Sequence, residues 1–223
     1  MCTRFYINIS DKELREIVRA AQASPLAEQF TLAGESMTAS GGEIFPTNVV
    51  PVIASSKSGK KTVFPMKWGY ALRGKDGKVS TILNARSETA GRKPTFWDSW
   101  RQHRCIIPAS YYFEWEHVTN QDRRRALDVG SVMDQTLRSE KIKYAIQPNG
   151  SEVTWLCGLY HIEDGLPHFV VLTREPGEGI RFIHDRMPLI LPKDRIDAWI
   201  DPSVPAEKIV PDALTEMVFE RAK

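Results

Sequence analysis

The sequence is poor in cysteine: Cys2, Cys105 and Cys157 are the only three among 223 residues, and no two have the short CxxC spacing. An odd number of widely spaced cysteines indicates neither a disulfide framework nor a zinc site. We therefore expect no metal and no cofactor, and thiol chemistry is the use that remains open.

The chain also lacks any stretch that approaches the run of about 20 apolar residues needed to span a bilayer. Its opening letters, MCTRFYINIS, are followed by the charged DKELRE, where a secretory signal would need an apolar segment. These two absences favour a cytoplasmic protein that makes no contact with membranes.

The sequence also lacks a large excess of either charge, because 30 Lys and Arg against 28 Asp and Glu leave a formal net charge of +2. Such a balance does not identify a nucleic-acid binder, since phosphate binding depends on where the basic residues gather. Hydrophobic residues at 42% and charged residues at 26% are typical of a globular protein with a sizeable core. At this length we expect one domain over residues 1–223, in a monomer, and no internal repeat is visible.

Local patterns predict both helices and strands. Ser10-Asp-Lys-Glu13 has the form of a capping box and predicts the start of an amphipathic helix that carries Leu14, Ile17 and Val18 on one side. Short β-type runs, bounded by Gly, Pro and Ser, cover residues 48–54, 61–71, 79–83, 103–107, 111–115, 143–146, 153–160 and 168–173. Further helices are predicted over 94–101, 176–182, 193–200 and 211–220. The fold class is therefore α+β, with a mainly antiparallel β-sheet or barrel core and peripheral helices.

Residues 117–140 differ from the rest of the chain. They contain the run Arg123-Arg124-Arg125 and show no apolar period. This pattern is typical of a long surface excursion, so we expect an insert outside the sheet.

Cys2 follows the initiator Met directly, and its small side chain permits removal of that Met. The new terminus would be a 1,2-aminothiol, with two nucleophiles on one residue. Because an α-amine titrates near 7.7–8.0 and a lysine near 10.4, roughly a few hundred times more of the α-amine is unprotonated at neutral pH. The amine can attack an aldehyde, and the thiol can then close the imine to a thiazolidine ring that resists hydrolysis. The position of Cys2 alone, however, favours a cysteine that has no catalytic function.

Three further segments carry groups suited to polar chemistry. Asn84 and Arg86 follow an apolar strand, where an amide can orient a hydroxyl and a guanidinium can bind a phosphate. Taken in isolation, this segment favours an Asn turn with a surface Arg–Glu pair. Glu114 stands among large aromatics, which raise the proton affinity of a carboxyl by desolvation, or else it faces solvent from a strand. His184 precedes an Asp-Arg pair and is the best candidate among the five histidines for carrying protons near neutral pH.

Together these segments resemble the SOS-response-associated peptidase family, whose members shield abasic sites in single-stranded DNA. The family's Met-Cys-Gly-Arg-Phe start corresponds to residues 1–5, its Asn-Ala-Arg-x-Glu-Thr motif to 84–89, and its Pro-Ala-x-Gly-Tyr/Phe-x-Glu-Trp motif to 108–115. Its His-Asp-Arg-Met-Pro motif stands unbroken at 184–188. Four motifs in the family's order make the resemblance specific.

The resemblance implies a role for each matching residue. Cys2 would crosslink to the abasic site, Glu114 and His184 would move protons around the opened sugar, and Asn84 would orient it. The residues that contact DNA would be Arg4, Trp68, Arg86, Thr173 and Arg186. Of these, the arginines would bind phosphates, the tryptophan would lie against bases and the threonine would line the pocket. The family also implies self-processing and lyase activities.

Two other functions would use the same residues. An amino-terminal-cysteine hydrolase would attack a small amide with its thiol, use the α-amine as base, and need a deep, closed pocket. A noncatalytic single-strand DNA-binding module would not need Cys2 at all. A covalent assay distinguishes these functions from capture of an abasic site.

Overall fold

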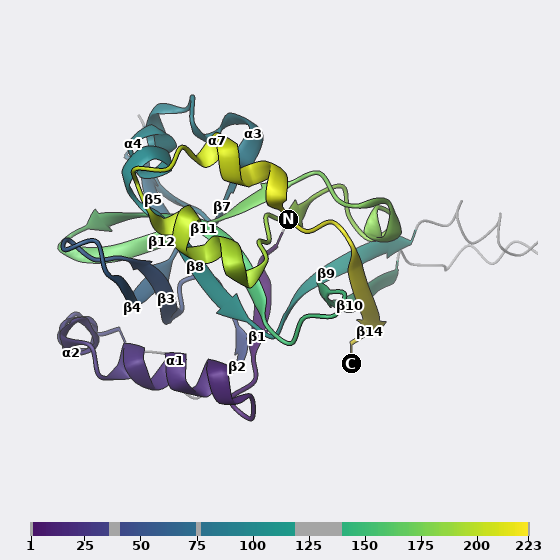
Figure 1. Ribbon diagram of the computed structural model, residues 1–223, viewed down its shortest axis with the longest axis horizontal. Helices are drawn as coiled ribbons and strands as arrows, with labels where there is room; N and C mark the ends of the chain where they lie inside the picture. The colour runs from purple at the N-terminus through teal and green to yellow at the C-terminus, as the bar shows by residue number, and fades with distance from the viewer. Residues whose placement is uncertain (1, 36–40, 75–76, 119–139, 223) are drawn as a thin grey trace, which may run out of the picture.

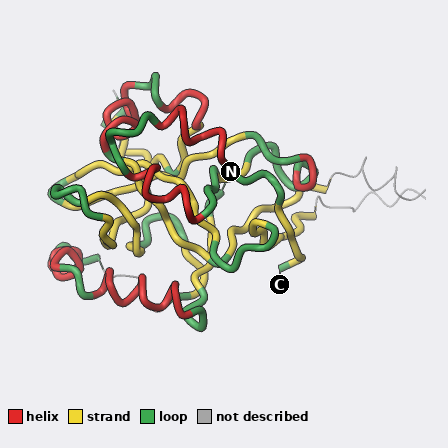
Figure 2. Tube along the Cα trace, viewed as in Figure 1, coloured by secondary structure: helices red, strands yellow, loops and turns green. Residues whose placement is uncertain are grey.

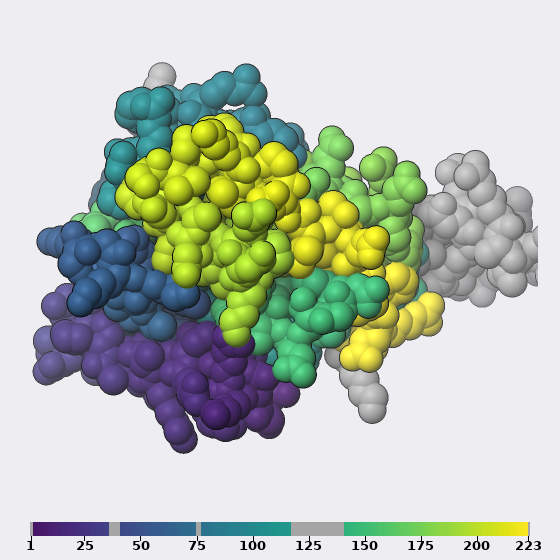
Figure 3. All heavy atoms as spheres, viewed as in Figure 1, coloured from purple at the N-terminus to yellow at the C-terminus, as the bar shows by residue number. Residues whose placement is uncertain are grey.

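The computed structural model describes residues 2–35, 41–74, 77–118 and 140–222. Strands form the centre of the molecule and short helices lie at its periphery (Figures 1 and 2). Helices α1 and α2 lie on one side of the sheets, and α3, α4 and α7 lie on the opposite side (Figure 1). Figure 3 shows that the carboxy-terminal segments form the middle of one face of the molecule. The predicted α+β class with a mainly antiparallel core is confirmed.

A five-stranded antiparallel sheet carries the start of the chain, in the order β14-β10-β9-β1-β2. Its strands are β1 (Arg4–Ile7), β2 (Gly42–Ile44), β9 (Tyr111–Val118), β10 (Glu140–Pro148) and β14 (Met217–Arg221). In the β1–β9 pair, Arg4 lies opposite Phe113 and Phe5 opposite Tyr112. This register places the first residues beside the strand that carries Glu114.

A second, seven-stranded sheet has the order β11-β8-β3-β4-β12-β13, with β7 paired to β12 and an additional β11–β12 pairing. Its strands are β3 (Val49–Ser55), β4 (Lys61–Trp68), β7 (Asn84–Arg86), β8 (Arg104–Ala109), β11 (Thr154–Glu163), β12 (Leu166–Arg174) and β13 (Met187–Pro188). Strand β7 runs parallel to β12, with Arg86 opposite Thr173. Two motifs that are distant in sequence therefore meet at one edge.

A separate hairpin joins β5 (Tyr70–Arg73) to β6 (Val79–Ile82).

The helices are short. They are α1 (Lys12–Gln22), α2 (Pro25–Leu32), α3 (Ser87–Ala90), α4 (Pro94–Gln102), α6 (Ile196–Ile200) and α7 (Ala206–Ile209), with 3-10 turns η1 (Glu178–Ile180), η2 (Lys193–Arg195) and η3 (Val210–Asp212). Helix α1 is the predicted amphipathic helix, and it buries Leu14 and Val18. Its N-cap is Asp11 and not Ser10, because the Asp11 carboxylate accepts a hydrogen bond from the Leu14 N–H at 2.8 Å. A carboxylate at this position also interacts favourably with the helix dipole.

Two predicted helices are wrong. Residues 211–220 form the turn η3 and then β14, which pairs with the edge of β10, so that Phe219 lies opposite Ile146. The free edge of a distant strand decides this outcome, and a local pattern does not reveal it. Residues 176–182 contain only the 3-10 turn η1, because Gly177 and Gly179 disfavour a continuous helix.

One hydrophobic cluster joins the two sheets and the helices, and it includes Cys2. Most of the predicted insert at 117–140 lies outside the described residues, but β9 and β10, which border it, pair as far as Val118 opposite Glu140. In the described part of the chain no helix is long and apolar enough to cross a bilayer.

Candidate functional site

Cys2 lies where the two sheets meet, and it is completely buried. Its thiol donates to the carbonyl oxygen of Arg4 at 3.6 Å. Its own carbonyl oxygen accepts a hydrogen bond from Nδ2 of Asn84 at 2.9 Å. Asn84 on β7 therefore holds the start of the chain in place, and two of the residues predicted to be catalytic are in direct contact.

The surroundings of Cys2 favour the protonated thiol. Burial raises its pKa well above the usual range, and the nearby carboxyl group of Glu114 raises it further, whereas the hydrogen bond to Arg4 lowers it. A low-dielectric site and a negative neighbour both disfavour a thiolate. Chemistry at Cys2 therefore needs a base that takes the thiol proton as the new bond forms.

Glu114 was predicted to exchange protons, and this residue is only 3% exposed. It lies on β9, opposite Tyr144 of β10. Burial raises its pKa to about 6, although a hydrogen bond from the backbone of Trp115 lowers it in part. The alternative of a solvent-facing glutamate is wrong. A carboxyl with this pKa can exchange protons close to neutral pH.

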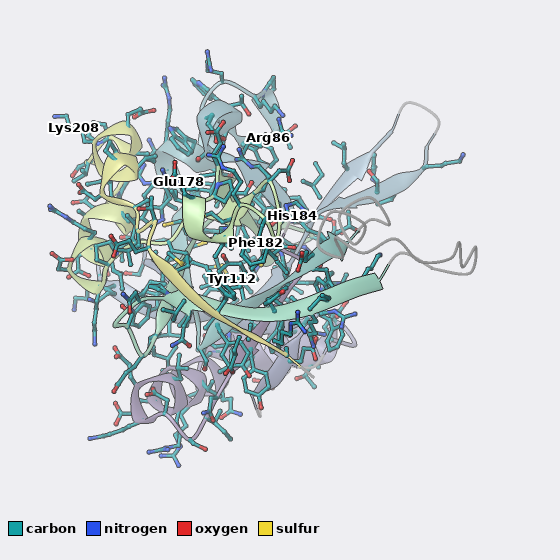
Figure 4. All side chains as sticks on the ribbon, turned by 90° about the vertical axis from the view of Figure 1, so that its right-hand side faces the viewer. Arg86, Tyr112, Glu178, Phe182, His184 and Lys208 are labelled. Carbon is teal, nitrogen blue, oxygen red and sulfur yellow. The ribbon has the colours of Figure 1, made fainter. Side chains whose placement is uncertain are left out.

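His184 has two possible partners for Nδ1. This atom lies 2.7 Å from Oδ1 of Asp185 and 3.0 Å from the backbone nitrogen of Arg186. The two contacts need different protonation states, because a protonated Nδ1 donates to the carboxylate and an unprotonated Nδ1 accepts from the N–H. When Nδ1 carries the only ring proton, Nε2 is the basic nitrogen of the ring. Figure 4 views this side of the molecule, with Arg86 above His184 and Tyr112 below it.

A pocket of about 340 Å³ opens beside the His184 segment. It is lined by Arg86, Glu175, Pro176, Arg181, Asp185 and Arg186. Arg86 and Arg181 are both exposed, so their guanidinium groups can reach an anion in the pocket. Reasoning from sequence missed Arg181, because no motif includes it and only its place in a turn just before His184 marks it.

Arg4 lies on the five-stranded sheet among aromatic and acidic neighbours. It forms an ion pair with Glu43 at 3.0 Å. Its guanidinium lies 4.5 Å from the ring centre of Phe45 and 5.4 Å from that of Trp115. These contacts orient the guanidinium and partly neutralise its charge, and its contact with DNA stays a prediction.

Trp68 does not have the position predicted for it. Its side chain is 0% exposed, its Nε1 donates to the carbonyl oxygen of Leu83 at 3.0 Å, and its ring packs against Phe5 and Phe169. Strand β4 lies inside the sheet, between β3 and β12, so the large apolar ring fills the core. Neither face of the ring is accessible in this structure, and contact of Trp68 with bases stays a prediction.

Thr173 and Arg186 are also buried, and their predicted contact with DNA stays a prediction. Thr173 is 0% exposed and donates to the carbonyl oxygen of Ala85 at 3.4 Å. Arg186 binds the carboxylate of Glu88 through both Nη atoms, at 2.8 and 2.9 Å, and donates to the backbone oxygen of Thr173 at 2.7 Å. Such a bidentate pair fixes the site's framework and leaves the guanidinium little freedom to bind a phosphate.

No group of three or more His, Cys, Asp or Glu side chains within the described ranges could hold a metal ion. The three cysteines are free and buried.

Burial of Glu114 predicts a pH-dependent effect of replacing it by glutamine. The pKa of Glu114 in the folded protein, about 6, lies above the ordinary 4.5, so the folded state favours the protonated carboxyl. Wild type therefore has its full stability below about pH 4 and loses part of it as the pH rises through 6. We expect Glu114→Gln to gain about 2 kcal/mol relative to wild type between pH 4 and pH 7.5, at about 1.4 kcal/mol per pKa unit. Urea unfolding of both proteins at these two pH values measures the gain. A difference in stability that does not change with pH would contradict a raised pKa.

Fold and site together define a class of protein. It is an α+β protein in which Cys2 accepts a hydrogen bond from the amide of Asn84 and lies near the carboxyl group of Glu114. The sequence profile of the SOS response associated peptidase (SRAP) family matches residues 1–221. The chain therefore belongs to the SRAP family.

Similar proteins agree with this assignment. Abasic site processing protein YoaM of Bacillus subtilis is 31% identical over 173 residues, which cover 72% of this chain and 68% of YoaM. Abasic site processing protein HMCES of Pongo abelii is 22% identical over 67% of this chain and 48% of its own length. The crystal structure of a phage-related protein from Bordetella bronchiseptica has the same fold, with a TM-score of 0.64 and 20% identity over all of this chain and 94% of the other.

Proposed function

We propose that this protein captures abasic sites in single-stranded DNA through a covalent bond to Cys2, after removal of Met1. The observation that carries the proposal is the grouping of Asn84, Glu114 and Cys2, in which the amide binds the cysteine and the carboxyl group lies near its thiol. The relatives named abasic site processing proteins point to the same lesion.

The chemistry is the condensation of an aldehyde with an aminothiol. An abasic sugar opens to an aldehyde, and the α-amine of Cys2 attacks its carbonyl carbon, so that water leaves and an imine forms. The sulfur of Cys2 then attacks the imine carbon and closes a five-membered thiazolidine ring. Aldehyde and aminothiol thus give thiazolidine and one water, with no oxidant or metal.

The protons in these steps have suitable carriers. Glu114, with a pKa of about 6, can take the thiol proton, and His184 can move a proton between the oxygens of the sugar. Asn84 positions Cys2 through its Nδ2 atom. The buried Oδ1 atom of Asn84 has no hydrogen-bond partner among the described residues. We propose that it accepts a hydrogen bond from a hydroxyl of the opened sugar.

The exposed arginines beside His184 supply the contact with DNA. Arg86 and Arg181 line one pocket, where their guanidinium groups suit phosphates on either side of the lesion. Contacts of this kind follow the backbone and not the base sequence, so we propose binding that is independent of sequence and weakened by salt.

The test uses three single strands that differ only at one sugar. The processed protein is mixed with an intact strand, an abasic strand, or an abasic strand whose aldehyde has been reduced to an alcohol, and then run on a denaturing gel. We expect a heat-resistant shifted band with the abasic strand alone, because only it offers a carbonyl to the amine. Equal shifts for all three strands would exclude capture through the aldehyde.

The same experiment separates the other functions. A small-amide hydrolase would turn over an amide and form no stable adduct with DNA, and a noncatalytic module would bind all three strands without a covalent band. Self-removal of Met1 and strand cleavage belong to the proposal too. The mass of the purified chain reports the first, and the length of the released strand reports the second.

A further inference from the structure

Tyr112 has a hydroxyl that the site described above does not use. The side chain is 0% exposed, and its oxygen has no hydrogen-bond partner among the residues that the structure describes. A buried hydroxyl without a partner is destabilising, and phenylalanine would fill the same space without that penalty. A tyrosine at this position therefore indicates that the hydroxyl gains a partner in another state of the site.

The candidate partners lie around it. Tyr112 stands two residues before Glu114 on β9, so both side chains project from the same face of the strand. It pairs across the sheet with Phe5, which follows Cys2 closely in the chain. Burial raises the pKa of Tyr112, and a negative charge on Glu114 or on Cys2, once its thiol loses the proton, raises it further, so the phenol keeps its proton at neutral pH. Tyr112 is thus a hydrogen-bond donor next to the nucleophile.

None of the residues that the structure describes donates a hydrogen bond to the sulfur of Cys2. It donates its own proton to the carbonyl oxygen of Arg4, which cannot bind a sulfur that has lost the proton. The amide nitrogen of Asn84 is already bonded to the carbonyl oxygen of Cys2. As the sulfur becomes negative in a desolvated site, a neutral O–H that points to it stabilises the developing charge.

We propose that the hydroxyl of Tyr112 donates a hydrogen bond to the sulfur of Cys2 while the thiazolidine ring closes. The inference rests on the proposed function and extends it to the second chemical step. In that step the sulfur–carbon bond forms, the π electrons of the protonated imine become the lone pair of nitrogen, and the thiol proton passes to the carboxylate of Glu114. Tyr112 keeps its proton throughout.

The test separates the two chemical steps in Tyr112→Phe. Borohydride traps the imine and so measures attack by the amine, whereas the heat-resistant band without borohydride measures ring closure. We expect trapping at the wild-type rate and ring closure about 10- to 100-fold slower, the range for losing one hydrogen bond to a charged group. We also expect a melting temperature no lower than that of wild type, because the variant removes an unpaired hydroxyl.

Tyr70→Phe is the matched control. Tyr70 is equally buried, but it lies on β5, and its hydroxyl is 3.3 Å from Oγ of Ser99. We expect both chemical rates to stay at wild type in this variant. Unchanged ring closure in Tyr112→Phe, or a fall in ring closure that a lower melting temperature accompanies, would overturn the inference.

A second measurement needs no DNA and therefore does not depend on the proposed function. Alkylation of Cys2 by iodoacetamide, followed by the mass of the amino-terminal peptide across pH 6 to 10, reports how readily the thiolate forms. We expect the alkylation profile of Tyr112→Phe to shift to higher pH, and an unshifted profile would overturn the inference. If wild type forms no adduct with abasic DNA, the proposed function fails, and this profile alone decides the role of Tyr112.

Discussion

Replacing Cys2 with alanine is expected to abolish the heat-resistant adduct with abasic single strands and to leave noncovalent binding within about twofold of wild type. The thiol is needed to close the ring, and without it the α-amine can form only an imine, which water reverses. Binding depends on guanidinium groups that do not contact the sulfur, because Arg86 and Arg181 line a pocket to which Cys2 does not contribute. A denaturing gel measures the adduct, and fluorescence anisotropy with an intact strand measures binding.

Two controls make the result specific. Cys157→Ala removes another free, buried cysteine and should retain full adduct formation. Arg86→Ala should show the reverse pattern, with weaker binding and a salt dependence that is shallower by about 0.7 in log–log slope, the value for one phosphate contact on a single strand. A Cys2→Ala protein that loses binding in parallel with the adduct would indicate misfolding, and one that keeps the adduct would exclude Cys2 as the nucleophile.

The second large effect concerns proton transfer. We expect His184→Ala and Glu114→Gln each to slow adduct formation by about 10²–10⁴-fold, the usual contribution of a positioned acid or base, and to leave the final yield unchanged. The rate falls because opening of the sugar and loss of the thiol proton both need a proton carrier. The yield stays because the ring itself is the thermodynamic product. Time courses with abasic DNA in excess measure both quantities.

Matched variants test the assignment. Glu116→Gln alters the next glutamate on the same face of β9, whose carboxylate accepts from the hydroxyl of Tyr144, and His103→Ala alters a histidine paired with Asp98. Both should react at the wild-type rate. Asn84→Ala should be slower than wild type but milder than the proton carriers, since it positions Cys2 and exchanges no proton. Wild-type rates in both His184→Ala and Glu114→Gln would leave Cys2 as the only catalytic residue.

Much of the fold could be predicted because local signals agree with the tertiary outcome. Helix α1 combines an N-cap with an apolar stripe, and β3, β8, β11 and β12 are apolar runs between turn residues. The segment at 211–220 failed because its pattern fits a helix, whereas the open edge of β10 binds it as a strand. The energy that decides this case comes from a partner more than 60 residues away, and no local window contains it.

The site shows the same division. The sequence by itself determined which chemistry is possible: an aminothiol at Cys2, a carboxyl among aromatics at Glu114, and an imidazole at His184. These properties depend on the residue types and their immediate neighbours in the chain, so they can be predicted from the sequence without a structure.

Only the tertiary structure decided which groups are buried, which are exposed and which touch. It placed Trp68 and Thr173 inside the core, left Arg181 exposed at a pocket, and joined Asn84 to Cys2. Burial and contact depend on pairing between strands that are far apart in sequence, and the pairing of β1 with β9 brings the carboxyl of Glu114 near the thiol of Cys2. Desolvation at that junction raises the pKa values of both groups, an effect that arises only once the chain has closed around them.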